Sequence, residues 1–147
     1  VDNHHKADRR GRAAPLNMVM TSTGAASAVS KAIPELKGKL SGNAIRVPTP
    51  NVSLAILNLN FEKSVGDTKA INAFIQSKAQ SEQWQAQIDY SDSPEAVSTD
   101  FVGSEKVAIF DAKATIATDN RATLYVWYDN EMGYSTQVIR VAEEMAK

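Results

Sequence analysis

The side chains best suited to chemistry in this sequence are donors to an anion. Thr23 and Gly24 begin an alanine-rich run, where a hydroxyl and the free backbone N–H groups of a helix start can hold a phosphate. Ser22 or Thr23 is predicted to cap this helix, and Gly24 has no side chain to keep a ligand from the backbone. An ordinary capped helix without a ligand is the alternative, which the motif alone leaves open.

Two arginines could add positive charge to such a site. Arg46 lies in a short apolar stretch just before two prolines, and Arg10 lies in the polar, basic segment 1–15. If Arg46 is buried it needs an anionic partner, and its guanidinium can hold a phosphate through two parallel bonds. The alternatives are a strand residue that faces water for Arg46 and a solvated basic arm for Arg10.

The residues of most catalytic and metal sites are missing or badly placed. The chain has no cysteine, which excludes a thiol nucleophile and thiolate metal ligands within it. His4 and His5 are neighbours that point apart on a loop or strand, so they are interpreted as solvated loop residues and no metal site is predicted. No serine stands in a nucleophile motif either, so no catalytic residue is expected in this chain.

Charge and hydropathy limit the possible partners. The 147 residues carry 16 Lys plus Arg and 17 Asp plus Glu, a formal charge of −1, so no global field attracts nucleic acid or an acidic membrane surface. No apolar run is long enough for a membrane span, and the polar start does not resemble a signal peptide. We expect a cytoplasmic protein, and a first residue of Val rather than Met indicates a fragment of something longer.

Hydrophobic periodicity predicts helices and strands in separate blocks. The apolar run at 16–20 is predicted to lead straight into the first helix. The Asp67–Thr68 pair is predicted to cap the second helix, with Ile71, Phe74, Ile75 and Ala79 as its core stripe. Helices are expected at 24–33, 68–79 and 132–146, and strands at 44–47, 52–63, 87–90, 107–110, 114–117 and 122–128.

This order of elements indicates an α+β fold, with a large, mostly antiparallel sheet covered on one face by helices. Residues 1–147 are expected to form one domain. The strand at 52–63 has apolar residues of both parities, so either a bulge shifts its register or both of its faces are partly covered. The strands at 107–128 are predicted to form an antiparallel meander.

Five sequence blocks together resemble phosphorylating glyceraldehyde-3-phosphate dehydrogenase. Their order and rough spacing match that family across nearly all of the chain, and the fourth and fifth blocks are the most specific. They are residues 9–14 (RRGRAA), 22–26 (STGAA), 33–40 (IPELKGKL), 46–53 (RVPTPNVS) and 127–135 (WYDNEMGYS).

The resemblance implies a C-terminal catalytic domain that is incomplete at its N-terminus. In the family, the nucleophilic Cys, the His that activates it and the Rossmann domain for NAD (or NADP) all lie upstream of the matching region. A Cys thiolate attacks the aldehyde, a hydride passes to NAD, and inorganic phosphate releases the product as an acyl phosphate. This chain alone should therefore be inactive.

The resemblance also assigns roles to individual residues. It implies that Thr23 and Gly24 bind inorganic or substrate phosphate with Arg10 nearby, and that Arg46 holds the substrate C3 phosphate. The residues that match the nicotinamide site are Asn130, which bonds the carboxamide and fixes the presented ring face, and Tyr134, beside the ring. Residues 1–15 match the tail of an S-shaped loop near a neighbouring subunit's cofactor, which implies a homotetramer that uses triose phosphate and inorganic phosphate.

Two positions depart from the usual pattern, and two other functions remain open. Met20 stands where many members have Pro, and Pro15 where Ala is usual, which indicates a divergent branch. A fragment of erythrose-4-phosphate dehydrogenase is one alternative, although residues 22–26 favour the triose enzyme. A stand-alone phosphate-binding or assembly module is the other.

Overall fold

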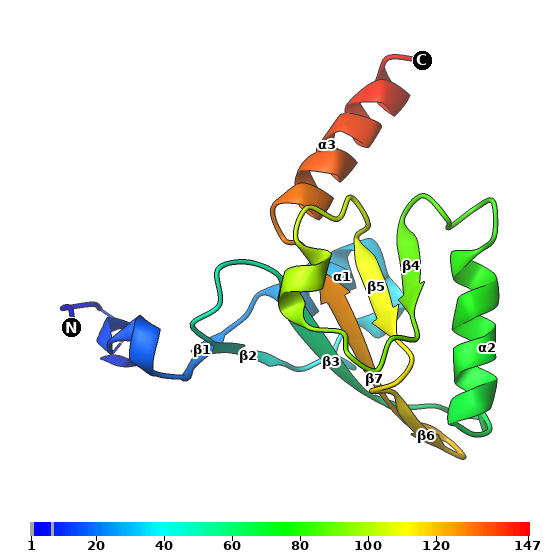
Figure 1. Ribbon diagram of the computed structural model, residues 1–147, viewed down its shortest axis with the longest axis horizontal. Helices are drawn as coiled ribbons and strands as arrows, with labels where there is room; N and C mark the ends of the chain where they lie inside the picture. The colour runs from blue at the N-terminus through cyan, green and yellow to red at the C-terminus, as the bar shows by residue number, and fades with distance from the viewer. Residues whose placement is uncertain (1, 7) are drawn as a thin grey trace. The chain divides into compact units, whose positions relative to one another are not determined.

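A computed structural model describes residues 2–6 and 8–147, and the chain divides into two compact units, Val1–Pro50 and Asn51–Lys147 (Figure 1). Two compact units can belong to one folding domain, so the expectation of a single domain over 1–147 stays a prediction. Among the described residues, no helix is long and apolar enough to cross a membrane.

The first unit contains a two-stranded ribbon and one helix. Strand β1 (Val19–Ser22) pairs antiparallel with β2 (Asn43–Arg46), and helix α1 (Ala25–Ala32) follows β1. The apolar run at 16–20 was predicted to lead straight into the helix, and this is wrong because its second half forms β1. Val19 and Thr21 are β-branched, and the partner strand satisfies their backbone groups.

The basic entry segment folds back on itself through its own hydrogen bonds. The Asp2 carboxylate accepts bonds from Arg12 Nε and the Ala13 N–H, each at 2.8 Å. The Asn3 N–H donates to the Gly11 carbonyl at 2.7 Å, and this close approach leaves no room for a side chain at residue 11. Two 3₁₀ turns, Asp8–Gly11 and Ala14–Leu16, complete the segment.

The second unit is a five-stranded mixed sheet with two helices. Its order is β3-β7-β5-β4, and β6 pairs with the same central strand, β7. Figure 1 shows α2 beside β4. The elements are β3 (Ser53–Asn60), α2 (Thr68–Ala79), β4 (Ile88–Ser91), β5 (Ala108–Asp111), β6 (Ile116–Thr118), β7 (Arg121–Tyr128) and α3 (Met132–Met145).

This arrangement confirms the α+β class with a mostly antiparallel sheet. The strands predicted at 107–128 pair antiparallel, β5 and β6 each with β7, whereas β4 and β5 are parallel. The connection between them contains a 3₁₀ turn at Ser98–Phe101 and is long enough to return the chain in the same direction.

Strand β3 is shorter and more regular than the sequence predicted. It covers Ser53–Asn60 instead of 52–63, and its register with β7 is continuous from the Ser53–Tyr128 pair to the Asn60–Arg121 pair. A register shift by a bulge is therefore excluded. Leu54 and Ile56 lie on one face of the strand with 37% and 53% of their surfaces exposed, so this chain alone leaves that face open.

The core lies between α2 and the sheet. The buried Ile71 of α2 packs into a cluster with Phe110, Ala112, Ala117 and Ala122.

Phe74, predicted as part of the same stripe, is 58% exposed and lies under the Lys78 ammonium. The core residues of α2 are spaced four apart, at Ile71, Ile75 and Ala79, so each is rotated slightly around the helix axis from the one before, toward the side of Asn72. On that side, Asn72 donates to the Ala112 carbonyl. Phe74 therefore lies at the opposite edge of the buried face of α2.

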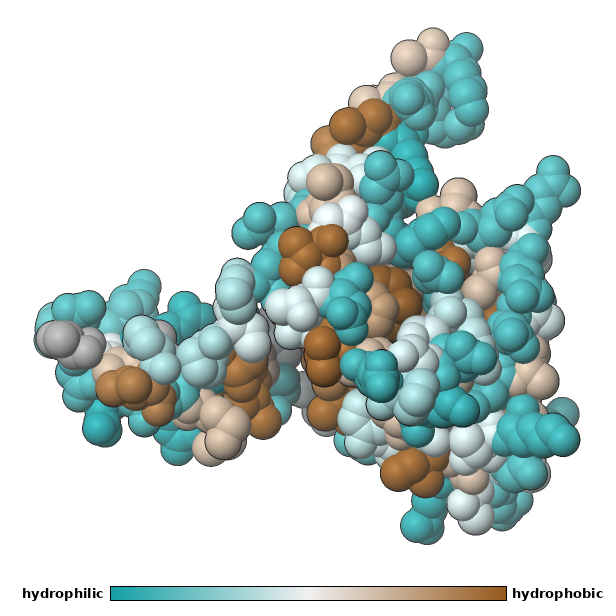
Figure 2. Space-filling model, viewed as in Figure 1, coloured by the Kyte–Doolittle hydropathy of each residue, from teal (hydrophilic) through white to brown (hydrophobic). Residues whose placement is uncertain are grey.

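Helix α3 begins and ends close to its predicted bounds, but its apolar face is open. Val138, Val141 and Met145 are 49%, 59% and 83% exposed. Figure 1 shows α3 extending away from the sheet, and Figure 2 shows apolar atoms along it.

The cap of α2 gives a stability prediction. Asp67 accepts the Ala70 N–H at 2.8 Å, so Asp67→Ala should lower the free energy of unfolding by about 0.5–2 kcal/mol. Chemical denaturation measures this loss. Lys69→Ala, an exposed change in the same turn, is the control, and equal stabilities of the two variants would contradict the capping role.

Candidate functional site

The turn between β1 and α1 carries the first candidate group. Gly24 is the N-cap of α1, so the predicted cap at Ser22 or Thr23 is one or two residues early. The Thr23 hydroxyl instead accepts the Ala25 N–H at 3.2 Å. This bond uses a lone pair of the Thr23 oxygen, so the O–H hydrogen remains able to donate to an anion.

Gly24 leaves open space at this turn. A Cβ built on it would have no atom within 4 Å, and its φ of −87° is accessible to any residue. The first bond of the helix runs from the Ala28 N–H to the Gly24 carbonyl at 2.9 Å. Glycine is therefore not required here by the backbone, and its absent side chain leaves the helix start open to a ligand.

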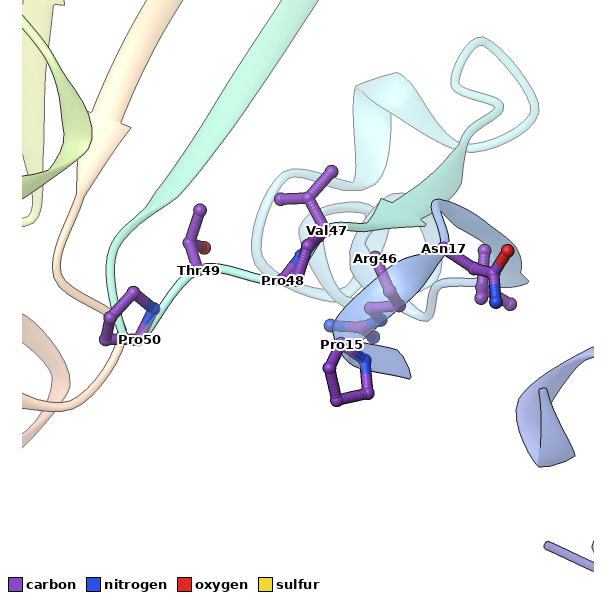
Figure 3. Close-up of a pocket in the computed structure, with 8 residues that line it drawn as sticks. Pro15, Asn17, Arg46, Val47, Pro48, Thr49 and Pro50 are labelled. Atoms are coloured by element: carbon purple, nitrogen blue, oxygen red, sulfur yellow. The ribbon is translucent and has the colours of Figure 1, made fainter. Parts of the chain in front are cut away.

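Arg46 ends β2 on the same face of the ribbon as Thr21. Its Nε donates to Thr21 Oγ1 at 3.3 Å, and the residue is exposed. Arg46 lines a cavity of about 410 Å³ within the first unit (Figure 3). The other lining residues are Pro15, Asn17, Val19, Val47, Pro48, Thr49 and Pro50.

Arg10 is exposed in the turn Asp8–Gly11, which lies against β1. Among the described residues, no hydrogen bond joins Arg10 or Thr23 to Arg46. All three belong to the same compact unit.

The loop from β7 to α3 carries the second candidate group. Asp129 is 2% exposed, and both of its carboxylate oxygens accept hydrogen bonds. Oδ1 accepts the N–H groups of Glu131 and Met132 at 2.9 and 3.0 Å. Oδ2 accepts the Gly103 N–H at 2.8 Å and Asn51 Nδ2 at 3.0 Å.

These donors explain the acidity of the buried carboxyl group. The backbone N–H groups of Gly103 and Met132 have the largest effects, and with Glu131 and Asn51 they lower the pKa of Asp129 from 3.8 to about 2. Burial acts in the opposite direction and is outweighed. The carboxylate is therefore ionised at neutral pH and holds the loop in place.

Asn130 and Tyr134, the two predicted cofactor residues, lie on either side of the start of α3. Asn130 is exposed, and its Oδ1 accepts a bond from Ser53 Oγ at 3.2 Å. Tyr134 is 71% exposed. Between them, a Cβ on Gly133 would lie 2.9 Å from the Lys106 carbonyl oxygen, so the helix start approaches this backbone too closely for any side chain.

Comparison with known proteins decides the family. The profile described as "Glyceraldehyde 3-phosphate dehydrogenase, C-terminal domain" matches residues 1–130. The chain belongs to this family. The match agrees with the fold above and with the five sequence blocks.

Bacterial relatives extend the same result over almost the whole chain. The chain is 62% identical over 146 residues to a "Glyceraldehyde-3-phosphate dehydrogenase-like protein" of Pseudomonas aeruginosa. It is 45% identical over 144 residues to "Glyceraldehyde-3-phosphate dehydrogenase" of Salmonella typhimurium and to "Glyceraldehyde-3-phosphate dehydrogenase A" of Escherichia coli. These alignments cover 97–99% of this chain but only 32–43% of the relatives' lengths.

Sequence reasoning missed part of the segment at 129–134, which contains the end of the β7–α3 loop and the first turn of α3. Asp129 stands two and three residues before Glu131 and Met132, whose N–H groups it accepts, and this spacing is a readable signal of helix capping. Its bonds to Asn51 and Gly103 had no such signal, because those residues are distant in sequence. Ser53 was also missed, since nothing near it in the sequence indicates Asn130.

Asp129 gives a pH-dependent stability prediction. A carboxyl group whose pKa is lowered on folding stabilises the folded chain above its ordinary pKa, and this contribution disappears as the pH falls from about 4 to about 2. Asp129→Asn should lose about 1.5–3 kcal/mol at pH 7, the value of a hydrogen bond to a charged group, and the difference from wild type should shrink toward pH 2.

Denaturant unfolding at several pH values measures both effects. The exposed Asp92→Asn is the matched control and should differ little from wild type at any of them. A difference between Asp129→Asn and wild type that stays constant from pH 7 to pH 2 would contradict the account.

Proposed function

We propose that this chain is the phosphate-binding and nicotinamide-orienting part of an oxidoreductase. The complete enzyme would convert D-glyceraldehyde 3-phosphate, inorganic phosphate and NAD to 1,3-bisphosphoglycerate and NADH. The observation that carries the proposal is the turn at Thr23–Gly24, with a hydroxyl hydrogen free to donate and open space beside a helix start. Family membership supplies the reaction class.

The phosphate groups would be held by donors of the first unit. The Thr23 O–H and the open helix start suit inorganic phosphate or the substrate phosphate, and Arg10 adds charge nearby. Arg46 binds the C3 phosphate of the triose through its guanidinium. A charge-assisted bond contributes about 1.5–3 kcal/mol and a neutral one about 0.5–1.5, so Arg46 should matter more than Thr23.

The nicotinamide ring would be oriented by residues of the second unit. Asn130 bonds the carboxamide of NAD (or NADP), and the exposed Tyr134 lies beside the ring. The rest of the cofactor would be bound by a dinucleotide-binding domain outside this chain. The aligned share of the bacterial relatives, 32–43%, leaves room for such a domain in proteins of that length.

The nucleophile would also come from outside this chain, which contains no cysteine. A Cys thiolate forms the covalent intermediate, and the isolated chain is therefore inactive. The complete protein is a cytoplasmic homotetramer that acts in glycolysis or gluconeogenesis.

Substitution of Arg46 tests the phosphate assignment in the complete polypeptide. Arg46→Ala should raise KM for the triose phosphate more than tenfold, because two charge-assisted bonds are lost, while Thr23→Ala should raise it less than about tenfold. Steady-state kinetics measures both. Arg9→Ala, an exposed arginine of the same unit, is the control, and an unchanged KM in Arg46→Ala would refute the assignment.

A methyl group at Gly24 tests the open space beside the helix start. Gly24→Ala fits the backbone and meets no protein atom, so the melting temperature should fall only by the small amount that a poorer N-cap residue costs. The methyl group should nevertheless obstruct a bound anion and raise KM for inorganic phosphate severalfold. An unchanged KM for both phosphate and the triose phosphate would place the anion elsewhere.

A further inference from the structure

The residues at the start of β3 and the loop after β7 are joined by two side-chain hydrogen bonds. Asn51 Nδ2 donates to Asp129 Oδ2 at 3.0 Å, and Ser53 Oγ donates to Asn130 Oδ1 at 3.2 Å. The pairing of Ser53 with Tyr128 places these residues at the same end of the β3–β7 ladder. We call residues 51–53 the clamp segment.

The middle of the clamp segment is strained. Val52 has a φ of 71°, a left-handed conformation that β-branched residues rarely adopt. Its side chain is 8% exposed, so packing holds this conformation in place. Backbone strain of this kind costs about 1–3 kcal/mol and concentrates at functional sites.

The two hydrogen bonds from the clamp segment hold different parts of the loop after β7. Asp129 also accepts N–H groups from Gly103, Glu131 and Met132, so its bond from Asn51 belongs to a buried network that fixes the backbone. The bond from Ser53 reaches only the exposed side chain of Asn130. Its loss would leave the backbone network intact and free the amide.

The Ser53 bond also determines what Asn130 offers to a ligand. With one lone pair of Oδ1 taken by Ser53, the amide keeps both Nδ2 hydrogens and its second Oδ1 lone pair. These groups complement the C=O and NH₂ of a carboxamide. An amide without this bond can rotate and present its groups in other directions.

We propose that Ser53 is a positioning residue that holds the Asn130 amide toward the nicotinamide carboxamide and so determines which face of the ring receives the hydride. This inference rests on the proposed function, in which Asn130 bonds the carboxamide. Ser53 touches neither substrate nor cofactor and acts through Asn130.

Kinetics and isotope labelling of the complete polypeptide provide the main test. Ser53→Ala should raise KM for NAD by about threefold to tenfold, the equivalent of one neutral hydrogen bond, with an unchanged melting temperature. With aldehyde deuterated at C1, wild type should label one face of the nicotinamide C4, and Ser53→Ala should label both, as read by proton NMR of the product. Ser53→Thr keeps the hydroxyl and should restore both values.

The sheet offers a matched control. Thr123 Oγ1 donates to Asn58 Oδ1 at 3.0 Å across the same β3–β7 pair, away from the loop. Thr123→Ala removes the same kind of bond and should change neither KM for NAD nor the labelled face. An unchanged labelled face and KM in Ser53→Ala, or equal effects of Ser53→Ala and Thr123→Ala, would overturn the proposal.

A crystal structure of the complete Ser53→Ala polypeptide without cofactor separates this inference from the proposed function. The Asn130 side chain should leave its wild-type position while Asp129 keeps its partners, whether or not the protein oxidises an aldehyde. An inactive wild-type protein would refute the proposed function and with it the cofactor role of Ser53. An Asn130 side chain that stays in place would refute the positioning role alone.

Discussion

The loop between β7 and α3 depends on one buried carboxylate. Asp129 is 2% exposed and accepts four bonds, which connect the end of β7 to Asn51, two residues before β3, to the segment after the 3₁₀ turn at Ser98–Phe101 and to the start of α3. An ionised group at this depth is stable only because every bond comes from a fixed donor. The position of Asn130, the next residue, follows from this network.

The two candidate groups use different physical means to present donors. At Thr23–Gly24 the donors are presented by open space. The Thr23 hydroxyl accepts only one N–H, and no protein atom lies where a side chain of residue 24 would be, so the helix start is accessible. At Asn130 the means is restraint, because Gly133 allows no side chain against the Lys106 carbonyl and Ser53 holds the amide. A phosphate accepts hydrogen bonds from many directions and needs only accessible donors. A planar carboxamide needs donors and acceptors fixed in one plane.

The sequence was informative wherever a local rule decides the structure. Helix bounds at α2 and α3, the β7 strand and the α+β class followed from periodicity and capping, and the sequence blocks identified the family. The prediction for residues 16–20 was wrong because a distant partner decides there: β1 became a strand since β2 pairs with it. The parallel pairing of β4 with β5 was not predicted, because it depends on the path between the two strands. In the candidate site, Ser53 and Asn51 were missed for the same reason, since they meet residues 129 and 130 only after β3 and β7 pair.

The central claim is that this chain supplies phosphate and nicotinamide contacts to a reaction whose nucleophile lies elsewhere in the complete protein. The most direct measurement is the rate of NADH formation from D-glyceraldehyde 3-phosphate at increasing inorganic phosphate, for the complete polypeptide and for the 147-residue chain alone. The account predicts a rate that saturates with phosphate for the complete polypeptide and none for the chain alone. NADH formation by the isolated chain, or a rate independent of phosphate in the complete polypeptide, would contradict it.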